Sequence, residues 1–508
     1  MNTVLLKTST IFEKKEEVLF KNKTFTFLYL ASLMLFVTGI SYFSLFSQSL
    51  RLDEAQSLWQ SSHAIKRVVN IIGQDVHVPL YAIMLHFWEL FFGDGVATAR
   101  ILSLIFFLLS IPTSYFVAKA AYDRSVGLFT ATLVAMSPFM NWYGNEIRMY
   151  SLFSFFTLLN QYFFIRIFKP SPTHNTALIW TGYAVTALFG IYIHYFFWLV
   201  LATQAIFYFS HTSLFAKGSF KNFIATFFVL LISFTPWVWY IKNLGLASNT
   251  QPMLVKPTAI NIFNTFSQFL FGFQDDHTNT LLVSLWPLLV LFGFFTMRKN
   301  TKLSPETVYI SMATVVPIVL ALTISFLYKP VFLSRYLILA APSLYILIAW
   351  FADMFSKRLS FSLKTLFVTL TIFTLFLQTS RADTPVKENY HDASIYISQH
   401  ASSSDIVALS APFTIYPFEY YYTGQAAVTT LPVWNRFEVG AIPPFTQSKL
   451  ESEVKTLTQS HQKIWLLLSY NQGYEKQIYQ YFETHFQRLE KKEFSPGLTL
   501  YSYKLRYD

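Results

Sequence analysis

The sequence predicts a polytopic α-helical membrane protein that carries a small α/β domain after its last membrane span. The chain has 508 residues, of which 53% are hydrophobic and 13% are charged, whereas soluble proteins carry roughly a quarter charged residues. Apolar stretches near the length that crosses a bilayer, about 20 residues, recur along the chain. After residue 380 the pattern changes to short helices and strands of ordinary polar content.

About eleven apolar segments are predicted to span the membrane. They cover residues 25–46, 98–118, 126–141, 150–168, 176–193, 195–210, 222–240, 281–297, 307–327, 333–353 and 361–378. Lys and Arg gather in alternate connecting loops and in the N-terminal tail 1–24, which places that tail in the cytoplasm. The same loops explain most of the net charge of +11, so the basic balance gives no support to nucleic acid as a partner.

The first outer loop, residues 47–97, is predicted to hold juxtamembrane helices. Residues 79–93 are apolar but short, and they contain His86 and Glu89, so this segment is expected to be interfacial rather than spanning. The stretch "EAQSLWQSSHAIKRVVNIIG" is expected to form one amphipathic helix in the interface. The residues expected to face lipid are Leu58, Trp59, Ile65, Val68, Val69 and Ile72.

Residues 381–508 are predicted to form a soluble α/β domain outside the cytoplasm, because eleven crossings from a cytoplasmic start end on the outer side. Residues 25–380 then form the membrane module. The chain contains no phosphate-binding glycine loop, so nucleotide binding has no support. It has no cysteine, which excludes disulfides and thiolate metal sites.

Ionisable and aromatic residues from distant segments are placed on the outer side by this topology. Charged groups at membrane depth are costly and mark functional sites, and carboxylates together with Arg suit a reaction that needs a base and an anion clamp. The predicted catalytic residues are Asp53, Glu54 and Glu146. The predicted substrate-binding residues are His77, Tyr81, Arg148, Tyr150, His194, Tyr195, Arg335 and Tyr336.

Structural roles compete with these functional ones. Asp53 followed by Gln56 fits a helix N-cap with its capping-box partner. Glu146 suits the N-terminus of the following helix through the helix dipole. His194 fits an interhelical hydrogen bond, and Arg335 fits a side chain that extends to the lipid headgroups.

Six stretches, in their order, resemble the bacterial relatives of protein O-mannosyltransferases and the aminoarabinose lipid A transferases, which belong to the GT-C superfamily of membrane glycosyltransferases. They are "LDEAQSLW", "HVPLYAIMLHFW", "ARILSLIF", "SPFMNWYGNEIRMYSLFSFF", "GIYIHYFFWL" and "FLSRYLILAAP". The resemblance covers about residues 25–355 and is strongest from Asp53 to Tyr150. The chain departs from it at Val78, where the family usually has a proline.

The resemblance implies a GT-C fold in a bacterial plasma membrane. It implies transfer of a monosaccharide from a polyprenyl-phosphate carrier to a hydroxyl of a lipid, glycan or protein acceptor on the outer face, with inversion. In this interpretation Asp53 is the general base and Glu54 holds a neighbouring helix or cation. Arg148 or Arg335 then binds the lipid phosphate, and the other residues orient sugar hydroxyls.

No cofactor is required for this chemistry, and a divalent cation is left open. Asp275 and Asp276 in "GFQDDHT" have the composition of a metal motif, but they fit a solvated loop equally. The rival function is a flippase or transporter for lipid-linked sugars. The absence of internal repeats and the position of the ionisable groups at span ends favour the enzyme.

Overall fold

The computed structural model describes residues 23–170, 175–244, 254–284, 303–381, 388–437 and 442–505. The chain divides into two compact units. The first, here the membrane unit, comprises Met1–Phe43, Arg100–Trp237 and Leu254–Ser380. The second, here the sheet unit, comprises Ser44–Ala99, Val238–Met253 and Arg381–Asp508.

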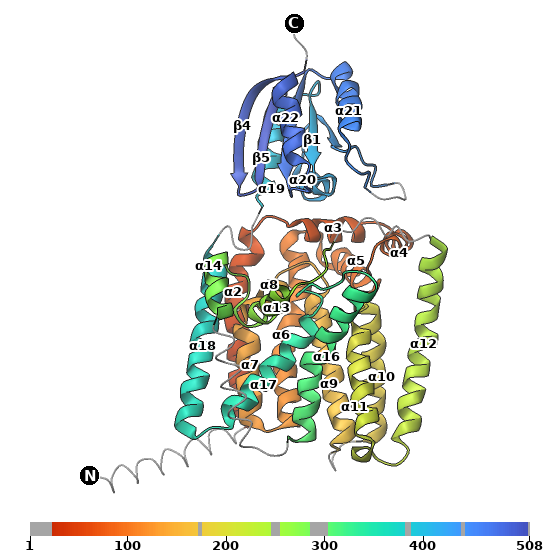
Figure 1. The fold of residues 1–508 in the computed structure, drawn as a ribbon, viewed down its shortest axis with the longest axis vertical. Helices are drawn as coiled ribbons and strands as arrows, with labels where there is room; N and C mark the ends of the chain where they lie inside the picture. The colour runs from red at the N-terminus through yellow and green to blue at the C-terminus, as the bar shows by residue number, and fades with distance from the viewer. Residues whose placement is uncertain are drawn as a thin grey trace, which may run out of the picture. The chain divides into compact units, whose positions relative to one another are not determined.

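Seven helices in the described residues are long and apolar enough to cross a membrane. They are α2 (Lys23–Ser47), α6 (Val96–Ala121), α9 (Tyr150–Phe168), α10 (Thr176–Ile193), α12 (Ser219–Leu244), α16 (Pro305–Leu327) and α18 (Lys357–Ser380) (Figure 1). Shorter apolar helices are α5 (Leu80–Phe92), α7 (Arg124–Met136), α11 (Phe197–Ser210) and, after the 3-10 turn η2 (Ile338–Ala340), α17 (Ala341–Asp353). The prediction of a polytopic helical membrane protein is confirmed.

The predicted span 126–141 is wrong as a single helix. Helix α7 ends at Met136, and α8 (Pro138–Gly144) begins after Ser137, whose hydroxyl accepts the N–H of Met140 at 3.1 Å. Proline disfavours the helical conformation of the residue before it, so the Ser-Pro step ends the first helix and caps the second. The predicted span 281–297 begins within α14 (Asp276–Ser284), and its remainder lies outside the described residues.

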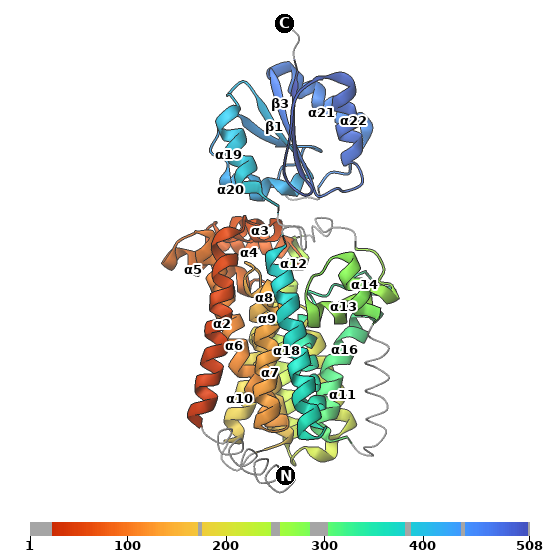
Figure 2. The same ribbon diagram turned by 90° about the vertical axis from the view of Figure 1, so that its left-hand side faces the viewer.

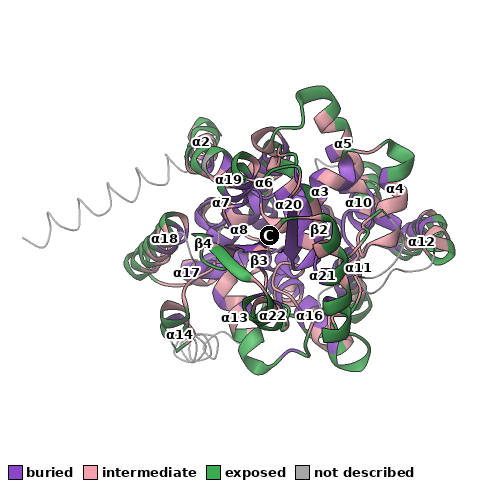
Figure 3. Cartoon of the chain, turned by 90° about the horizontal axis from the view of Figure 1, so that it is seen from above, coloured by how far each residue is buried: buried purple, intermediate pink, exposed green. Residues whose placement is uncertain are grey.

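Burial separates the interior helices of the membrane unit from its rim. The buried share of the span is 67% in α9 but 22% in α12 and in α18, and exposed residues are visible on both of the latter helices in Figure 3. In α7 every residue from Val126 to Met136 is buried. Apolar side chains on the rim helices are therefore the surface offered to lipid.

A buried polar network ties four helices of the membrane unit together. The Asn160 side-chain amide donates to the backbone oxygen of Tyr183 at 3.1 Å, and the Gln204 amide donates to Asn160 Oδ1 at 2.8 Å. Gln204 in turn accepts the Tyr183 hydroxyl at 2.9 Å and donates to the Tyr309 hydroxyl at 3.2 Å. Such interhelical hydrogen bonds hold helices together where lipid offers no alternative partner.

The sheet unit contains a five-stranded sheet in the order β2-β1-β3-β5-β4. The strands are β1 (Ile406–Ser410), β2 (Ala427–Thr430), β3 (Lys463–Ser469), β4 (Gln487–Ser495) and β5 (Leu498–Lys504). β1 is parallel to β2 and β3, whereas β5 is antiparallel to β3 and β4. Helices α19 (Tyr390–His400) and α20 (Ile415–Tyr421) lie on one side of the sheet, and α21 (Gln447–Ser460) and α22 (Glu475–His485) lie on the other (Figure 2). The predicted α/β architecture of this segment is confirmed.

The juxtamembrane segment of the sheet unit forms three helices, α3 (Leu52–Ser61), α4 (Ile65–Gln74) and α5. The predicted single amphipathic helix is wrong, because the chain breaks between α3 and α4. Leu58, Val68 and Ile72, which were expected to face lipid, are 4% exposed or less. Their apolar stripe is covered by protein, and a Cβ at Gly73 on α4 would lie 2.7 Å from Leu244.

Candidate functional site

The acid pair lies in the first turn of α3. Arg51 is the N-cap residue, and its backbone N–H donates to Glu54 Oε2 at 3.0 Å. The guanidinium Nε of Arg51 lies 3.7 Å from the same oxygen, and Glu54 is fully buried. The expected N-cap role of Asp53 with Gln56 is therefore wrong, since Arg51 and Glu54 fill those positions and Asp53 lies inside the helix.

Residues far along the chain surround this turn within the sheet unit. Glu388, 8% exposed, interacts electrostatically with both Arg51 and Asp53 and accepts a hydrogen bond from the Tyr470 side chain. Burial raises the pKa of Glu388, and the Asp53 charge adds to that rise, whereas Tyr470 and Arg51 oppose it. Because the two carboxylates interact electrostatically, the protonation of Glu388 and the charge on Asp53 are coupled.

Tyr470 has an unusual backbone. Its φ is +55°, and among the described residues it is the only one other than glycine with positive φ. This conformation costs free energy for a side chain with a Cβ and occurs where the surroundings impose it. Tyr470 directly follows β3, whose last residue, Ser469, accepts the hydroxyl of Tyr390 at 2.9 Å. The backbone at the end of β3 thus places the Tyr470 hydroxyl where it hydrogen-bonds to Glu388.

The remaining predicted residues of the sheet unit lie near the start of α5. His77 is half-buried, and Tyr81 is buried in the first turn of that helix. Asp75, just upstream, accepts the side-chain amide of Gln60 on α3 at 2.9 Å. Pro79 is the N-cap residue of α5.

In the membrane unit a tight turn joins α8 to α9. The Arg148 N–H donates to the Glu146 carbonyl at 2.7 Å, and Ser103 on α6 donates its hydroxyl to the Arg148 carbonyl at 3.2 Å. Both charged side chains are 5% exposed. Charges buried to this extent are retained for binding or catalysis more often than for stability.

An aromatic cluster lies beside this turn. The His194 ring stacks on Phe153 at 4.8 Å and lies 6.4 Å from the Tyr150 ring and 5.4 Å from the Tyr336 ring. The Arg335 guanidinium carbon lies 5.5 Å from the centre of the Tyr336 ring. A guanidinium near an aromatic face gains a cation–π attraction, and its fork of N–H donors suits the oxygens of an oxyanion.

Tyr195 points elsewhere. Its hydroxyl accepts the indole N–H of Trp237 on α12 at 3.0 Å. His194, in contrast, accepts the backbone N–H of Phe196 through Nδ1 at 3.1 Å. The tautomer is fixed by that contact.

Sequence reasoning missed several polar residues of the membrane unit. Arg100 on α6 is fully buried, although it stands in one of the quoted motifs. Asn141 in α8 and Asn145, the C-cap residue of that helix, are buried, and the Oδ1 atom of each accepts no hydrogen bond from a described residue. The sequence feature that could have identified them is an Asn inside an aromatic-rich run, where a buried amide oxygen without a hydrogen bond costs free energy.

A metal site finds no support in the part of the chain that the structure describes, where no group of three or more His, Asp or Glu residues is arranged to hold an ion. Asp275 accepts the backbone N–H of Thr278 at 3.0 Å and its hydroxyl at 2.8 Å. These contacts cap the turn that leads into α14, so Asp275 has the structural role in a loop that was expected as the alternative to metal binding.

No protein-family model matches the chain, and no curated protein matches it in sequence. Solved structures do. ArnT from Cupriavidus metallidurans in the apo state aligns over 94% of this chain and 98% of its own, with 10% identity and a TM-score of 0.62. ArnT bound to undecaprenyl phosphate aligns over 95% and 98%, with 11% identity and a TM-score of 0.61.

A second kind of protein shares the architecture. The apo form of the Archaeoglobus fulgidus oligosaccharyltransferase aligns over 86% of this chain and 69% of its own, with 13% identity and a TM-score of 0.51. These neighbours are GT-C proteins, so the predicted GT-C fold is confirmed.

Proposed function

We propose that this chain is a membrane glycosyltransferase that moves a monosaccharide from a polyprenyl-phosphate carrier to an acceptor hydroxyl. The observation that carries the proposal is the match to ArnT over nearly the full length of both chains, since one of the matched structures holds undecaprenyl phosphate. Fold alone does not assign chemistry. The two polar sites described above supply the groups that the reaction needs.

In the proposed reaction Asp53 is the general base. It takes the proton from the acceptor hydroxyl while that oxygen bonds to the anomeric carbon. The bond from this carbon to the phosphate oxygen breaks, its electron pair leaves with the lipid phosphate, and the configuration inverts. Asp53 suits the role better than Glu54, because Glu54 is fully buried and engaged by Arg51. General-base catalysis contributes roughly 10² to 10⁴ to the rate.

The leaving phosphate gains charge as the bond breaks, and the membrane unit supplies cations for it. Arg335, held over Tyr336, is the proposed phosphate ligand. Arg148 and Glu146 lie in the buried α8–α9 turn, and Asn141 and Asn145, in and at the end of α8, offer acceptors to sugar hydroxyls. His77, Tyr81, Tyr150, His194 and Tyr336 are proposed to orient the substrates, whereas Tyr195 is assigned to the contact with Trp237.

The reaction is proposed to occur on the outer face of a bacterial plasma membrane. The N-terminus is then cytoplasmic and residues 381–508 are extracytoplasmic, as the distribution of Lys and Arg indicates. No metal takes part in the proposed mechanism. The acceptor is a lipid, a glycan or a protein.

Reconstituted full-length protein tests the proposal when it is given a panel of polyprenyl-phosphate sugars and acceptors. We expect stoichiometric release of free polyprenyl phosphate with at least one donor. If the protein instead moves the lipid-linked sugar between leaflets and releases no carrier, the rival flippase function is correct.

A further inference from the structure

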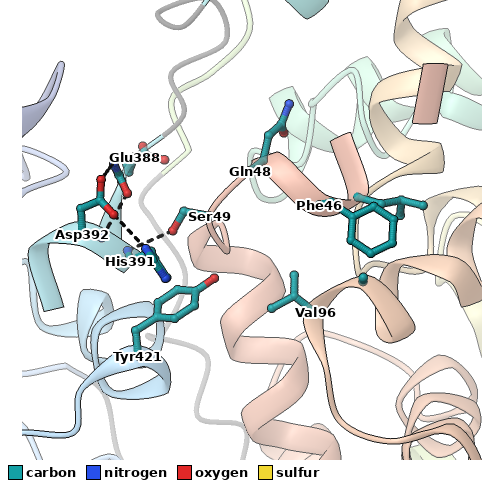
Figure 4. A pocket seen from close by; sticks show the side chains of 11 residues that line it. Phe46, Gln48, Ser49, Val96, Glu388, His391, Asp392 and Tyr421 are labelled. Atoms are coloured by element: carbon teal, nitrogen blue, oxygen red, sulfur yellow. Dashed lines mark hydrogen bonds and ion pairs between the residues drawn. The ribbon is translucent and has the colours of Figure 1, made fainter. Parts of the chain in front are cut away.

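A cavity of about 540 Å³ lies within the sheet unit, apart from the residues proposed above for catalysis. Four parts of the chain line it: the end of α2 with the residues that follow, the start of α6, the segment that opens α19, and Tyr421 on α20 (Figure 4). Its volume falls in the range of small-molecule sites, about 300–1,000 Å³.

One wall of the cavity is apolar. It consists of Leu45 and Phe46 at the end of α2 together with Val96 and Ala97 at the start of α6. Both helices are candidate membrane spans, and Phe46 is 64% exposed. A hydrocarbon chain can therefore continue from this wall along the apolar surface of a span.

The opposite wall is polar and held in place by hydrogen bonds. Asp392 accepts the Asn389 side-chain amide at 2.7 Å and lies 2.8 Å from His391 Nδ1. The His391 backbone N–H donates to Ser49 at 3.3 Å, and the Tyr421 hydroxyl accepts the N–H of Leu50 at 3.0 Å. These contacts join the start of α19 and the end of α20 to the residues that follow α2, so the wall is ordered before any ligand arrives.

The charge of the lining selects the kind of headgroup. The lining contains the carboxylates of Glu388 and Asp392, and none of the described residues that line it is Lys or Arg. Hydrogen bonds from His391 and Asn389 hold the pKa of Asp392 below its usual range, so this side chain is anionic at neutral pH. Carboxylates and side-chain amides accept hydrogen bonds from hydroxyl groups and repel phosphate.

Glu388 connects the cavity to the proposed base. Glu388 lines the cavity, and its carboxylate receives the Tyr470 hydrogen bond and interacts electrostatically with Asp53. A headgroup held against Glu388 thus presents its hydroxyls toward the first turn of α3. A polyprenyl phosphate needs cations that this lining lacks, so the cavity suits the other substrate.

We infer that this cavity binds the acceptor, and that the acceptor is an amphiphile with a polyhydroxyl headgroup free of negative charge. The identification as acceptor rests on the proposed function, whereas the class of ligand rests on the lining alone. The headgroup contacts Glu388, Asp392 and Tyr421, and the hydrocarbon chain lies on Phe46 and Val96.

The probe for this inference is an alkyl glucoside with a diazirine in its chain, crosslinked to the full-length protein in lipid nanodiscs. Val96→Trp fills the apolar wall, and Val433→Trp, at an exposed position of the same unit, is the matched control. We expect labelled peptides that contain residues 45–49, 96–97, 388–392 or 421. We expect at least a tenfold loss of labelling in Val96→Trp and none in Val433→Trp.

A second, more conservative variant tests the inference in case Val96→Trp fails to fold. Asp392→Asn keeps the size of the side chain, and loss of one charged acceptor should weaken glucoside labelling about tenfold. An alkyl phosphate of equal chain length should fail to compete. Equal competition by the phosphate, or full labelling in both cavity variants, would overturn the inference.

Steady-state kinetics of sugar transfer distinguishes the acceptor assignment of the cavity from the proposed transferase function. In Val96→Trp the KM for a glucoside acceptor should rise at least tenfold while the KM for the donor stays at the parent value. An unchanged acceptor KM would overturn the acceptor assignment. If the parent protein releases no carrier from any donor but is labelled as expected, the proposed function fails and the ligand class of the cavity stands.

Discussion

Replacing Glu54 by Gln should destabilise the protein without removing the proposed base. The substitution removes the negative charge that faces the Arg51 guanidinium, and the two side chains are 0% and 11% exposed. Removing one member of a buried ion pair costs about 3–5 kcal/mol. Gln keeps an oxygen that can accept the Arg51 N–H, and Glu388 still interacts electrostatically with Arg51, so the lower end, about 3 kcal/mol, applies.

This free energy is large enough to measure. For a unit of about 150–250 residues, 1 kcal/mol lowers the unfolding midpoint by about 2–4 °C. The sheet unit of Glu54→Gln should therefore unfold about 6–12 °C below the parent in detergent, followed by tryptophan fluorescence. Asp94→Asn, at an exposed acid of the same unit, is the matched control and should leave the midpoint unchanged.

Transfer activity separates the structural role of Glu54 from a catalytic one. Well below the midpoint, Glu54→Gln should transfer sugar within about tenfold of the parent rate per folded molecule, since general-base loss costs roughly 10² or more. A parent-like midpoint combined with a hundredfold loss of transfer would refute the reasoning and make Glu54 a catalytic residue.

Three further outcomes are expected. The raised pKa of Glu388 means that the folded state holds this proton more tightly than the unfolded chain, so stability should fall as pH rises above 4.5, the ordinary pKa of a Glu side chain. Glu388→Gln should reduce the dependence of the unfolding midpoint on pH, and an unchanged dependence would contradict this. Gln204→Leu leaves the Tyr183 hydroxyl without its acceptor and should cost about 1 kcal/mol in thermal unfolding; an unchanged midpoint would count against the network. Arg335→Lys loses the planar fork over Tyr336 and should raise the donor KM about tenfold; a parent-like KM would exclude it as the phosphate ligand.

The long spans were predictable because an apolar run of bilayer length has few alternatives to a membrane helix. The break at Ser137 was hidden, because the Ser-Pro step stands inside an uninterrupted apolar run and its capping signal is local. The pattern of Leu58, Val68 and Ile72 predicted an apolar face correctly. Periodicity states only that a face is apolar, and packing decides whether lipid or protein covers it.

The candidate site was predictable only within short stretches of sequence. The acid pair was recognisable as two adjacent carboxylates beside an apolar run. Which of the two is structural depends on the contact between Arg51 and Glu54, and no motif pointed to Arg51. Glu388 and Tyr470 follow Asp53 by hundreds of residues, and only the fold of the sheet unit brings them into electrostatic interaction with it. Tertiary proximity of this kind leaves no periodic trace in the sequence.

Substitution of Asp53 by Asn gives the most direct test of the central claim that this side chain is the general base of a lipid-linked sugar transfer. The measurement is the rate of free polyprenyl phosphate release by purified, reconstituted protein, beside Asp94→Asn as the matched control. The account predicts a rate at least a hundredfold below the parent, with an unchanged unfolding midpoint. Release at the parent rate by folded Asp53→Asn protein would contradict it.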